Sequence, residues 1–448
     1  LAVILVGVAL PAFSRFVDRD LALGFLQNPE LVLGLLLIAA VVGLAAGSYP
    51  AFILSSFRPV QVLKGTRGPA GRGSLFRTIL VVSQFAISIF LIISVAVVYQ
   101  QLRYSRSKGL GFNREQVVVL PTSNLIRQRF DSLRTQLQAH PGIVSVAAAR
   151  RVPSGRLLDS SGARVISGEN AEPVNFRIAF VRVSHDFIPT FQMEMASGRN
   201  FSREFPTDPK EAFILNEAAV EGLGWTAEEA LGRSFGYGSR TGKIIGVVRD
   251  FHFESLHQEI APIVFYLQPD YRHVVVRIRP DDMPTTLGFL KERWTELRPN
   301  YPFDYFFIDE NFDSLYRTEE KLGQVFGGFS LLAIFIACLG LFGLASFTAE
   351  RRIKEIGIRK VLGAPVGNIV FLLSREFTKW VLAANLIAWP IAYYAMNSWL
   401  QNFAYRTGMP FVLFLMAGTL AFGIALLTVS FQTIKAALRD PVESLRYE

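Results

Sequence analysis

Long apolar stretches without charge alternate along the chain with mixed, polar sequence. A helix needs roughly 20 apolar residues to cross the hydrocarbon core of a bilayer, which is about 30 Å thick. Five stretches without Asp, Glu, Lys or Arg reach that length. A shorter apolar run, Leu1–Phe13, is interpreted as the end of a helix that begins outside this sequence, with a cleaved signal peptide as the alternative. The predicted spans are Leu31–Phe57, Thr78–Leu102, Val325–Ala349, Trp380–Leu400 and Met409–Ile434.

Between Gln101 and Leu322 the pattern changes to mixed sequence with many Pro and Gly. Period-two alternation predicts strands there, and 3.6-residue periodicity predicts helices. The strand-helix-strand rhythm occurs twice, which predicts two small sheet-and-helix lobes. The fold class expected is therefore an α-helical transmembrane bundle plus an α+β extracytoplasmic domain. Strands are expected at Gln116–Pro121, Gly142–Ala149, Asn175–Val183, Gly242–Val248, His273–Ile278 and Phe303–Ile308, and helices at Arg127–Ala139, Thr285–Leu297 and Asn311–Gly323, the last running straight into the third span.

Composition and charge support a membrane protein and give it an orientation. Only 19% of the residues are charged, 51% are hydrophobic, and the mean hydropathy is +0.32, whereas soluble domains carry about 25% charged residues. Much of the net charge of +9 comes from basic clusters at residues 58–77 and 350–375, beside the predicted spans. Cytoplasmic loops carry such an excess, so both loops are predicted inside and residues 101–322 outside. Nucleic-acid binding is not expected, because it needs a basic face with stacking aromatics.

A dense charged run, "ERRIKEIGIRKVLGAP" at Glu350–Pro365, lies between two apolar stretches. Ser346–Gly357 is predicted to continue the third span as a helix. The Gly-Ala-Pro sequence is predicted to end it, because a residue before proline avoids the α region. A short helix over Val366–Ser374 is then expected to lie along the membrane with one apolar face. Two interpretations remain open: a membrane-anchoring elbow, or an arm that docks into a partner.

Two segments of the chain have similar sequences. "SSFRPVQVLKG" at Ser55–Gly65 follows the first complete span, and "ALRDPVESLRY" at Ala437–Tyr447 follows the last. Both have an apolar helix end, then Pro-Val, then Leu and a basic residue. Their identical place after a span favours an internal duplication of a membrane module.

These residues and their order resemble the bacterial FtsX/MacB-type permeases of the ABC transporter superfamily. The family module is one transmembrane helix, a large periplasmic domain and three further helices. The run from Glu350 to Phe377 looks like its cytoplasmic coupling region, and "IIGVVRDFHFESLHQEIAPIVFY" (Ile244–Tyr266) resembles a MacB-like periplasmic stretch. The closing "DPVESLRYE" is similar to the end of large double-module members.

The resemblance implies a domain organisation in which only the last part of a first module is present, as in an N-terminally truncated double-module member. It assigns residues 1–75 to the C-terminal tail of a first FtsX-like membrane module, 76–100 to the first transmembrane helix of the second module, 101–322 to a MacB-like periplasmic domain, and 323–448 to an FtsX-like three-helix transmembrane domain with its coupling region at 350–375.

The function implied is that of a non-enzymatic permease subunit in the bacterial inner (cytoplasmic) membrane, multi-pass, with a large periplasmic domain. It would couple ATP hydrolysis by a separate cytoplasmic ABC ATPase to periplasmic movement, for export of a lipoprotein, peptide or drug. The alternative is a signalling scaffold that activates a periplasmic hydrolase or a sensor kinase. Further partners implied are membrane lipids, a periplasmic adaptor or outer-membrane channel, and a second permease module in the same chain or a dimer. The expected ATPase-coupling residues are Glu350, Arg351, Lys354, Glu355, Gly357, Arg359, Lys360, Gly363, Ala364 and Pro365.

Other chemical signals are weak, and no catalytic, cofactor or metal site is predicted. No G-x-x-x-x-G-K-[ST] phosphate loop occurs; "GSRTGKI" at Gly238–Ile244 has one residue too few between its glycines. Asp159 with its two following serines lacks a nucleophile-elbow pattern. A metal interpretation of "DFHFESLH" is disfavoured, because histidines five apart do not share a helix face. Its candidate ligands are Asp250, His252, Glu254 and His257.

Overall fold

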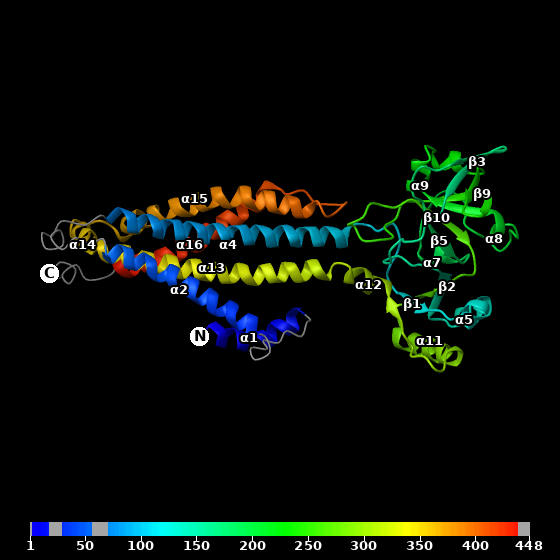
Figure 1. The fold of residues 1–448 in the computed structure, drawn as a ribbon, viewed down its shortest axis with the longest axis horizontal. Coiled ribbons are helices and arrows are strands. Elements are labelled where there is room, and N and C mark those ends of the chain that lie inside the picture. The colour runs from blue at the N-terminus through cyan, green and yellow to red at the C-terminus, as the bar shows by residue number, and fades with distance from the viewer. Residues whose placement is uncertain (1, 18–28, 56–69, 438–448) are drawn as a thin grey trace. The chain divides into compact units, whose positions relative to one another are not determined.

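The computed structural model describes residues 2–17, 29–55 and 70–437 (Figure 1). The chain forms two compact units. The first comprises Leu1–Ala96, Lys321–Tyr394 and Pro410–Glu448; the second comprises Val97–Glu320 and Ala395–Met409. The second unit therefore includes a loop, residues 395–409, that the sequence analysis assigns to the membrane part. The two segments with similar sequences and the basic residues 58–69 lie almost wholly outside the described residues.

The first unit is built from helices. Three helices in the described part of the chain are long and apolar enough to cross a membrane: Arg77–Ser107, Arg317–Glu350 and Phe411–Lys435. The predicted span at Trp380–Leu400 is helical but less apolar, because Asn385, Trp389 and Pro390 interrupt its aliphatic residues. The helices with residues in this unit are α1 (Ala2–Val17), α2 (Pro29–Ser55), α4 (Ala70–Ser107), α13 (Arg317–Arg351), α14 (Ile353–Val361), α15 (Val366–Leu400) and α16 (Phe411–Ala437).

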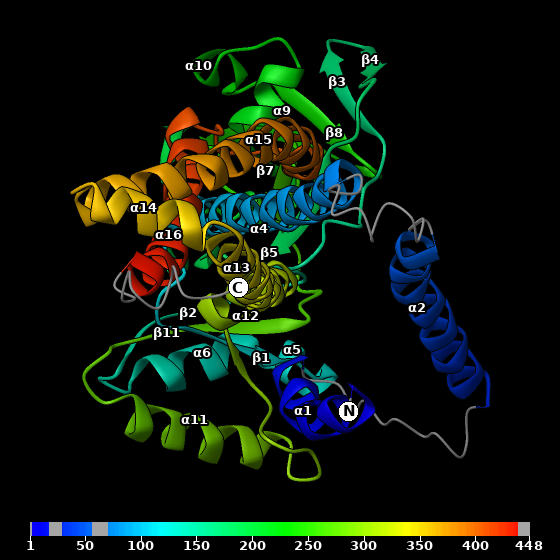
Figure 2. The same cartoon turned by 90° about the vertical axis from the view of Figure 1, so that its left-hand side faces the viewer.

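Helices α4, α13, α15 and α16 run side by side in both views (Figures 1 and 2). Buried alanines recur every four residues on α15 and α16, and on α13 with Leu341 in one of the positions, whereas α4 buries larger residues such as Phe85 and Ile89. Small side chains let helix backbones approach closely, the usual basis of packing in lipid. Large aliphatic side chains such as Leu331, Leu386 and Leu427 are about three-quarters exposed, as expected of a lipid-facing surface. The buried alanine stripes are Ala337, Ala345 and Ala349 on α13, Ala384, Ala388 and Ala392 on α15, and Ala417, Ala421 and Ala425 on α16.

The second unit contains one mixed sheet of 12 strands. Its order is β12-β1-β11-β2-β5-β10-β7-β9-β8-β3-β4, and β6 pairs with β9 off this path. Most pairs are antiparallel; β5 with β10 and β7 with β9 are parallel. The strands are β1 (Val117–Pro121), β2 (Ile143–Ala149), β3 (Ala163–Ser167), β4 (Asn170–Pro173), β5 (Ala179–Val183), β6 (Met195–Gly198), β7 (Ala212–Asn216), β8 (Ser234–Tyr237), β9 (Arg240–Val248), β10 (Ile263–Leu267), β11 (His273–Ile278) and β12 (Phe306–Phe307).

Two hydrophobic cores form on this sheet, so the expectation of two lobes needs a correction: their strands belong to one sheet. The first core packs Trp294 of α11 against β1, β2 and β11, and the second packs Phe213 and Phe235 of β7 and β8. The join is narrow, because β2 and β5 share the single register pair Ala149 and Val183. The helices are α5 (Asn124–Gln128), α6 (Phe130–Gln138), α7 (Phe187–Thr190), α8 (Asp208–Glu211), α9 (Glu217–Gly222), α10 (Ala227–Ala230), α11 (Met283–Leu297) and α12 (Ile308–Ser314).

Several predicted elements are shorter or broken in the structure. The helix predicted at Arg127–Ala139 is two helices that meet at Arg129. Only the second half of Asn175–Val183 is a strand, and Phe303–Ile308 shrinks to a two-residue strand. The helix predicted to run straight into the third span is interrupted between Ser314 and Arg317. Tyr316 explains this break: it is buried, and its hydroxyl accepts a hydrogen bond from Leu256 N at 2.9 Å.

Candidate functional site

The charged run folds as a helix between two turns. Residue Arg352 separates α13 from α14, so the prediction of one helix over Ser346–Gly357 is wrong. The Arg352 guanidinium explains the break, since it reaches α15 and pairs with the Glu376 carboxylate at 3.2 Å. Its N–H still lies 3.2 Å from the carbonyls of Thr348 and Ala349, which closes the last turn of α13. The two helices are therefore linked by a hydrogen-bonded corner.

A Schellman cap ends α14. Gly363 has φ +84°, the left-handed region that favours glycine. The Ala364 N–H donates to the Arg359 carbonyl at 2.9 Å, the bond that defines this cap, and the Leu362 N–H closes the last ordinary helical turn on the Ile358 carbonyl at 3.0 Å. Helix α15 then begins at Val366, directly after Pro365. The helix therefore ends where the Gly-Ala-Pro sequence predicts.

The helix that follows differs from its prediction. Val366–Ser374 is not a separate short helix, because α15 continues without a break to Leu400. The expected apolar face does not lie free along a membrane either: Ile369 is 2% exposed and packs inside the protein. Neither glycine nor proline occurs between Gly367 and Pro390, so nothing local ends the helix.

The predicted coupling residues fall within this helix-turn segment. Glu350 and Arg351 belong to the last turn of α13; Lys354, Glu355, Gly357, Arg359 and Lys360 lie on α14; Gly363, Ala364 and Pro365 form the turn. Arg359 and Glu355 form an ion pair at 2.7 Å, with both side chains 44% exposed. Gly357 is buried. The side chains of Arg351, Lys354 and Lys360 lie outside the described part of the structure.

The charged pattern hid an exposed apolar group on α14. Ile358, Val361 and Leu362 are 52%, 66% and 79% exposed. Their spacing of three and four residues places them on one helix face, and we call this set the apolar tip. Phe371, on the first turns of α15, is also 72% exposed. Exposed apolar groups of this kind mark contacts with a partner or with lipid. In the sequence, these apolar residues alternate with Arg359 and Lys360, and this alternation could have indicated an exposed apolar face on the charged helix.

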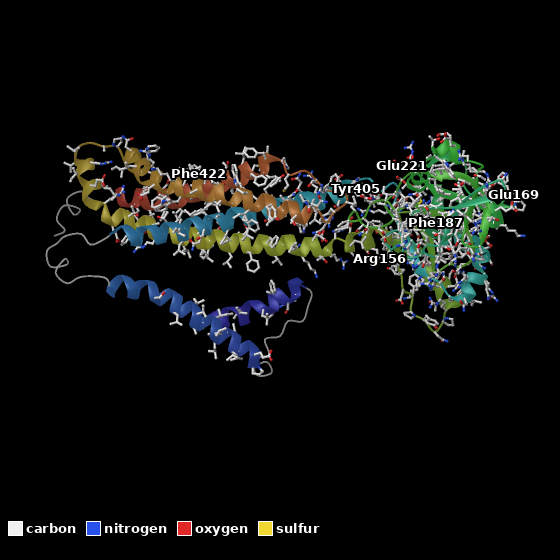
Figure 3. All side chains as sticks on the ribbon, turned by 45° about the horizontal axis from the view of Figure 1, so that its top comes forward. Arg156, Glu169, Phe187, Glu221, Tyr405 and Phe422 are labelled. Carbon is white, nitrogen blue, oxygen red and sulfur yellow. The ribbon has the colours of Figure 1, made fainter. Side chains whose placement is uncertain are left out.

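A second set of contacts lies in the second unit, between the "DFHFESLH" loop and the loop after α15. We call Leu256, His257, Tyr316, Phe403 and Tyr405 the junction (Figure 3 labels Tyr405). The His257 ring stacks on Phe403 with centroids 4.1 Å apart, and the N–H of Tyr405 donates to the Leu256 carbonyl at 3.3 Å. The hydroxyl of Tyr316, the residue directly before α13, accepts from Leu256 N, as described above. The loop after α15 and the beginning of α13 therefore meet the same short segment.

Helix α4 joins the same loop through Gln101. This side chain is fully buried, donates to the Tyr405 carbonyl at 2.9 Å and accepts from the Thr407 N–H at 2.8 Å. Lys108 lies over the Tyr405 ring at 3.4 Å, and His252 meets the same ring edge-on at 4.7 Å. Burial, together with the charge of Lys108, lowers the pKa of His252 to about 4, so this imidazole is neutral at physiological pH.

The residues suspected of metal binding have separate partners. Asp250 accepts from Ala218 N at 2.9 Å, Glu254 from Leu157 N at 2.7 Å, and His257 pairs with Glu319 at 3.3 Å. No group of three His, Cys, Asp or Glu side chains suited to a metal occurs among the described residues. The "GSRTGKI" segment is the tight hairpin between β8 and β9. Three of these four candidate ligands therefore serve contacts within the domain.

Comparison with known proteins gives these features a context. Residues 327–441 match the family model described as FtsX-like permease C-terminal. The macrolide export ATP-binding/permease protein MacB of Chromobacterium violaceum is 22% identical over 328 residues, covering 71% of this chain and 50% of that protein. The uncharacterised ABC transporter permease YknZ of Bacillus subtilis is 28% identical over 130 residues, covering 28% of this chain and 31% of that protein. The chain thus spans half or less of these relatives.

Solved extracytoplasmic domains are also similar. The periplasmic region of MacB from Actinobacillus actinomycetemcomitans shares 15% identity with a TM-score of 0.33, covering 46% of this chain and 94% of that structure. The extracellular domain of YknZ from Gram-positive bacteria shares 16% identity with a TM-score of 0.30, covering 42% of this chain and 96% of that structure.

Proposed function

Because the chain is an ABC permease of the FtsX/MacB type, we propose that it transmits ATP-driven movement of a separate cytoplasmic ATPase to its extracytoplasmic domain. The MacB relative combines ATP-binding and permease functions in its name, whereas YknZ is named as a permease alone. The movement serves export, toward a periplasmic adaptor or an outer-membrane channel. The cargo class proposed is a lipoprotein, a peptide or a drug, and a second permease module, in the same chain or in a dimer, completes the transporter.

The observation that carries this proposal is the way α14 is held at both ends. The ion pair between Arg352 and Glu376 fixes its beginning, and the Schellman cap at Gly363 fixes its end. A helix that transmits force from a bound ATPase must keep its angle to the membrane helices. The contacts at the two ends of α14 would hold that angle. The apolar tip and the exposed pair of Glu355 and Arg359 provide a surface for docking.

The junction supports the outward half of the proposal. Helix α13 is continuous from Arg317 to Arg351, so a displacement at its cytoplasmic corner reaches its other end. There Tyr316, in the turn directly before α13, and the loop after α15, through Phe403 and Tyr405, contact residues 256–257 of the sheet domain. A movement of α13 or of the loop after α15 would thereby be transmitted to residues 256–257 of the sheet domain.

The proposed location is the bacterial inner membrane with several spans, and it can be tested by labelling. In a Cys338→Ser background, Ser239→Cys lies at the exposed hairpin after β8 and Leu362→Cys in the exposed apolar tip. We expect a membrane-impermeant maleimide to label Ser239→Cys on intact spheroplasts and Leu362→Cys only after permeabilisation, since the basic corner faces the cytoplasm. Labelling in the reverse order contradicts the orientation.

Coupling itself is tested with the chain purified from its host membrane. We expect an ATPase to co-purify and its hydrolysis to rise in the presence of the chain. Arg359→Glu should lower that stimulation about tenfold if the ATPase surface is acidic, because like charges then meet across the contact. Loss of the ion pair within α14 alone costs only about 0.3–0.5 kcal/mol.

The matched control is the double exchange Glu355→Arg with Arg359→Glu. It rebuilds the ion pair within the helix but leaves an acid at position 359. If Arg359 itself contacts the ATPase, the double variant should stimulate ATP hydrolysis as poorly as Arg359→Glu does. Full recovery would assign Arg359 to helix stability, and a wild-type chain that binds no ATPase would contradict the proposed function.

A further inference from the structure

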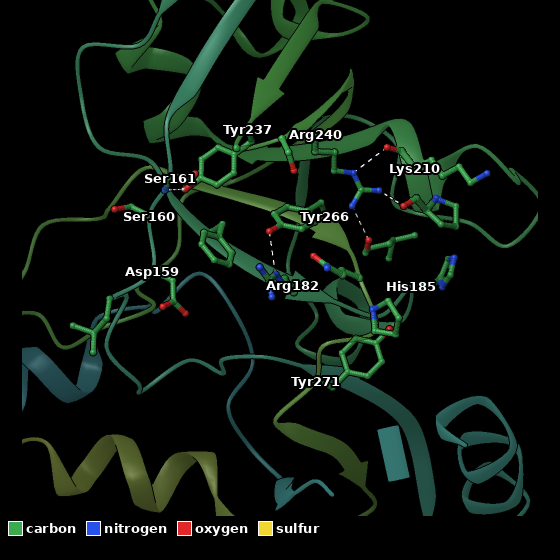
Figure 4. A pocket seen from close by; sticks show the side chains of 18 residues that line it. Asp159, Ser160, Ser161, Arg182, His185, Lys210, Tyr237, Arg240, Tyr266 and Tyr271 are labelled. Atoms are coloured by element: carbon green, nitrogen blue, oxygen red, sulfur yellow. Dashed lines mark hydrogen bonds between the residues drawn. The ribbon is translucent and has the colours of Figure 1, made fainter. Parts of the chain in front are cut away.

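A large open pocket lies on the sheet domain, away from the junction contacts. Its volume is about 1020 Å³, and its walls come from β5, β10, the hairpin between β8 and β9, and the segments around Asp159 and Pro269 (Figure 4). Pockets for drug-sized ligands measure about 300–1,000 Å³. The pocket is therefore large enough for a small molecule or a short peptide segment.

Three aromatic rings form one wall of the pocket. The Phe180 ring lies 5.7 Å from Tyr237 and 5.9 Å from Tyr266 between centroids, and the two tyrosines are 6.4 Å apart. The Tyr237 hydroxyl donates to the Ile178 carbonyl at 2.6 Å and accepts from Ser161 N at 2.7 Å, which fixes its ring. Burial raises the pKa of Tyr237 to about 12, so the phenol stays neutral. The three rings are inclined to one another by 31–65°, so the wall is closely packed and uncharged.

Arg182 and Asp159 on one rim of the pocket belong to a network that has more guanidinium groups than carboxylates and extends beyond the lining residues. Arg182 donates to the Tyr266 hydroxyl at 3.1 Å and pairs with Asp270. Asp270 also pairs with Arg127 and Arg150, and Asp159 pairs with Arg150 and Arg151. Four arginines therefore share two aspartates, which leaves two positive charges without a carboxylate in this described network. The rim attracts anions.

On the opposite rim, the hydrogen bonds of the Arg240 guanidinium all go to carbonyl oxygens within the described residues. Arg240 donates from Nε to the Lys210 carbonyl at 2.9 Å, from Nη1 to the Leu267 carbonyl at 2.8 Å, and from Nη2 to the Pro209 carbonyl. Its guanidinium carbon also lies 5.1 Å from the centre of the Tyr266 ring. These contacts orient the guanidinium, and no carboxylate in the described part of the chain pairs with it. Figure 4 shows Tyr266 between Arg182 and Arg240.

We propose that this pocket is a binding site for an anionic ligand with a flat aromatic body. The acidic group of the ligand would meet the uncompensated guanidinium groups, where charge-assisted hydrogen bonds are strongest. Its ring would pack against the partly exposed Phe180 and the guanidinium planes, since Tyr237 and Tyr266 are 3% and 7% exposed and support Phe180 from behind. The site needs no movement of the helices and no ATPase, so it stands independently of the coupling proposed above.

Two matched probes test the charge requirement on the full chain in lipid nanodiscs. N-acetyl-tryptophan carries a carboxylate, and N-acetyl-tryptophanamide has the same ring without the charge. We expect equilibrium dialysis to give at least about fivefold tighter binding of the acid, the preference that one charge-assisted hydrogen bond supports. Saturation-transfer NMR should place the indole ring against protein. Empty nanodiscs supply the background for both probes.

Variants assign the binding to this pocket. Arg240→Gln should lower the preference for the acid, with the remainder due to the network around Arg182, and Arg240→Lys should keep more of it because the charge remains. Tyr266→Leu should weaken both probes. The control is Arg233→Gln, an arginine that also lies over an aromatic ring, 4.5 Å from Trp225, but outside the pocket. Equal affinity for the two probes, absence of binding to the parent chain, or equal losses in Arg233→Gln would each overturn the proposal.

Discussion

Replacing Gly363 with valine is expected to abolish most of the stimulation of the ATPase. The residue has φ +84°, and a β-branched side chain in that region costs about 1–3 kcal/mol. The Schellman cap would open to relieve this strain, and α14 would lose its fixed angle to α15. Since 1.4 kcal/mol corresponds to a factor of ten, stimulated hydrolysis should fall at least about fivefold. The measurement is ATP hydrolysis in proteoliposomes that contain equal amounts of inserted chain.

A series of substitutions at Gly363 distinguishes backbone strain from the volume of the added side chain. Asparagine tolerates the left-handed region better than alanine, and alanine better than valine, so activity should fall in the order Asn, Ala, Val at position 363. Open space surrounds the position of an added Cβ at both Gly363 and Gly367, but Gly367 lies in the first turn of α15 with ordinary φ. Gly367→Val should therefore remain near the parent value. Equal loss at both positions would show that side-chain volume at the docking surface, not the turn, controls coupling.

Removing the Tyr405 ring is expected to disconnect the sheet domain while leaving the ATPase bound. The ring carries the contacts with Lys108 and His252, which together stabilise the junction by about 1–2 kcal/mol. In Tyr405→Ala, an environment-sensitive dye on Ser239→Cys should lose most of its ATP-dependent change in fluorescence. Co-purification of the ATPase should be unchanged, because the corner around α14 is intact.

The matched control is Tyr405→Phe, which keeps the ring. The contacts described for this side chain use the ring, whereas Gln101 binds the main chain of Tyr405. The phenylalanine variant should therefore behave as the parent does. A full response in Tyr405→Ala would exclude this loop as the route by which movement enters the domain. Loss of ATPase binding in the same variant would indicate that the chain is misfolded or not inserted.

Local patterns predicted those elements whose signal lies within a few residues. β1, β2, β9, β11 and α11 appear within about two residues of their predicted bounds. β7 and β10 were missed because every residue in them is buried, and a continuous apolar run has no period that identifies a strand. The union of both lobes in one sheet depends on pairing between β2 and β5, which no local pattern encodes.

The candidate site was predictable to the same extent. The end of α14 followed from Gly363 and Pro365, whose backbone preferences act locally. The break at Arg352 depends on Glu376, which is 24 residues further along the chain, and the gap before α13 depends on Leu256. Leu362 is exposed because no other part of the described chain packs over it, which its neighbours in the sequence do not determine. Such features come from tertiary contacts, and sequence periodicity does not report them.

The alanine stripes on α13, α15 and α16 have a mechanical consequence. Methyl groups give a helix face shallow relief, so a neighbouring helix meets no deep interlocking side chains. One stripe repeat of four residues corresponds to about 6 Å along the axis. Within Ala384–Ala392 of α15 and Ala417–Ala425 of α16, a shift by that step places alanine where alanine was before. On these two helices the shallow face would let a neighbour slide more easily than the bulky buried side chains of α13 and α4, such as Leu341 and Ile89, would allow.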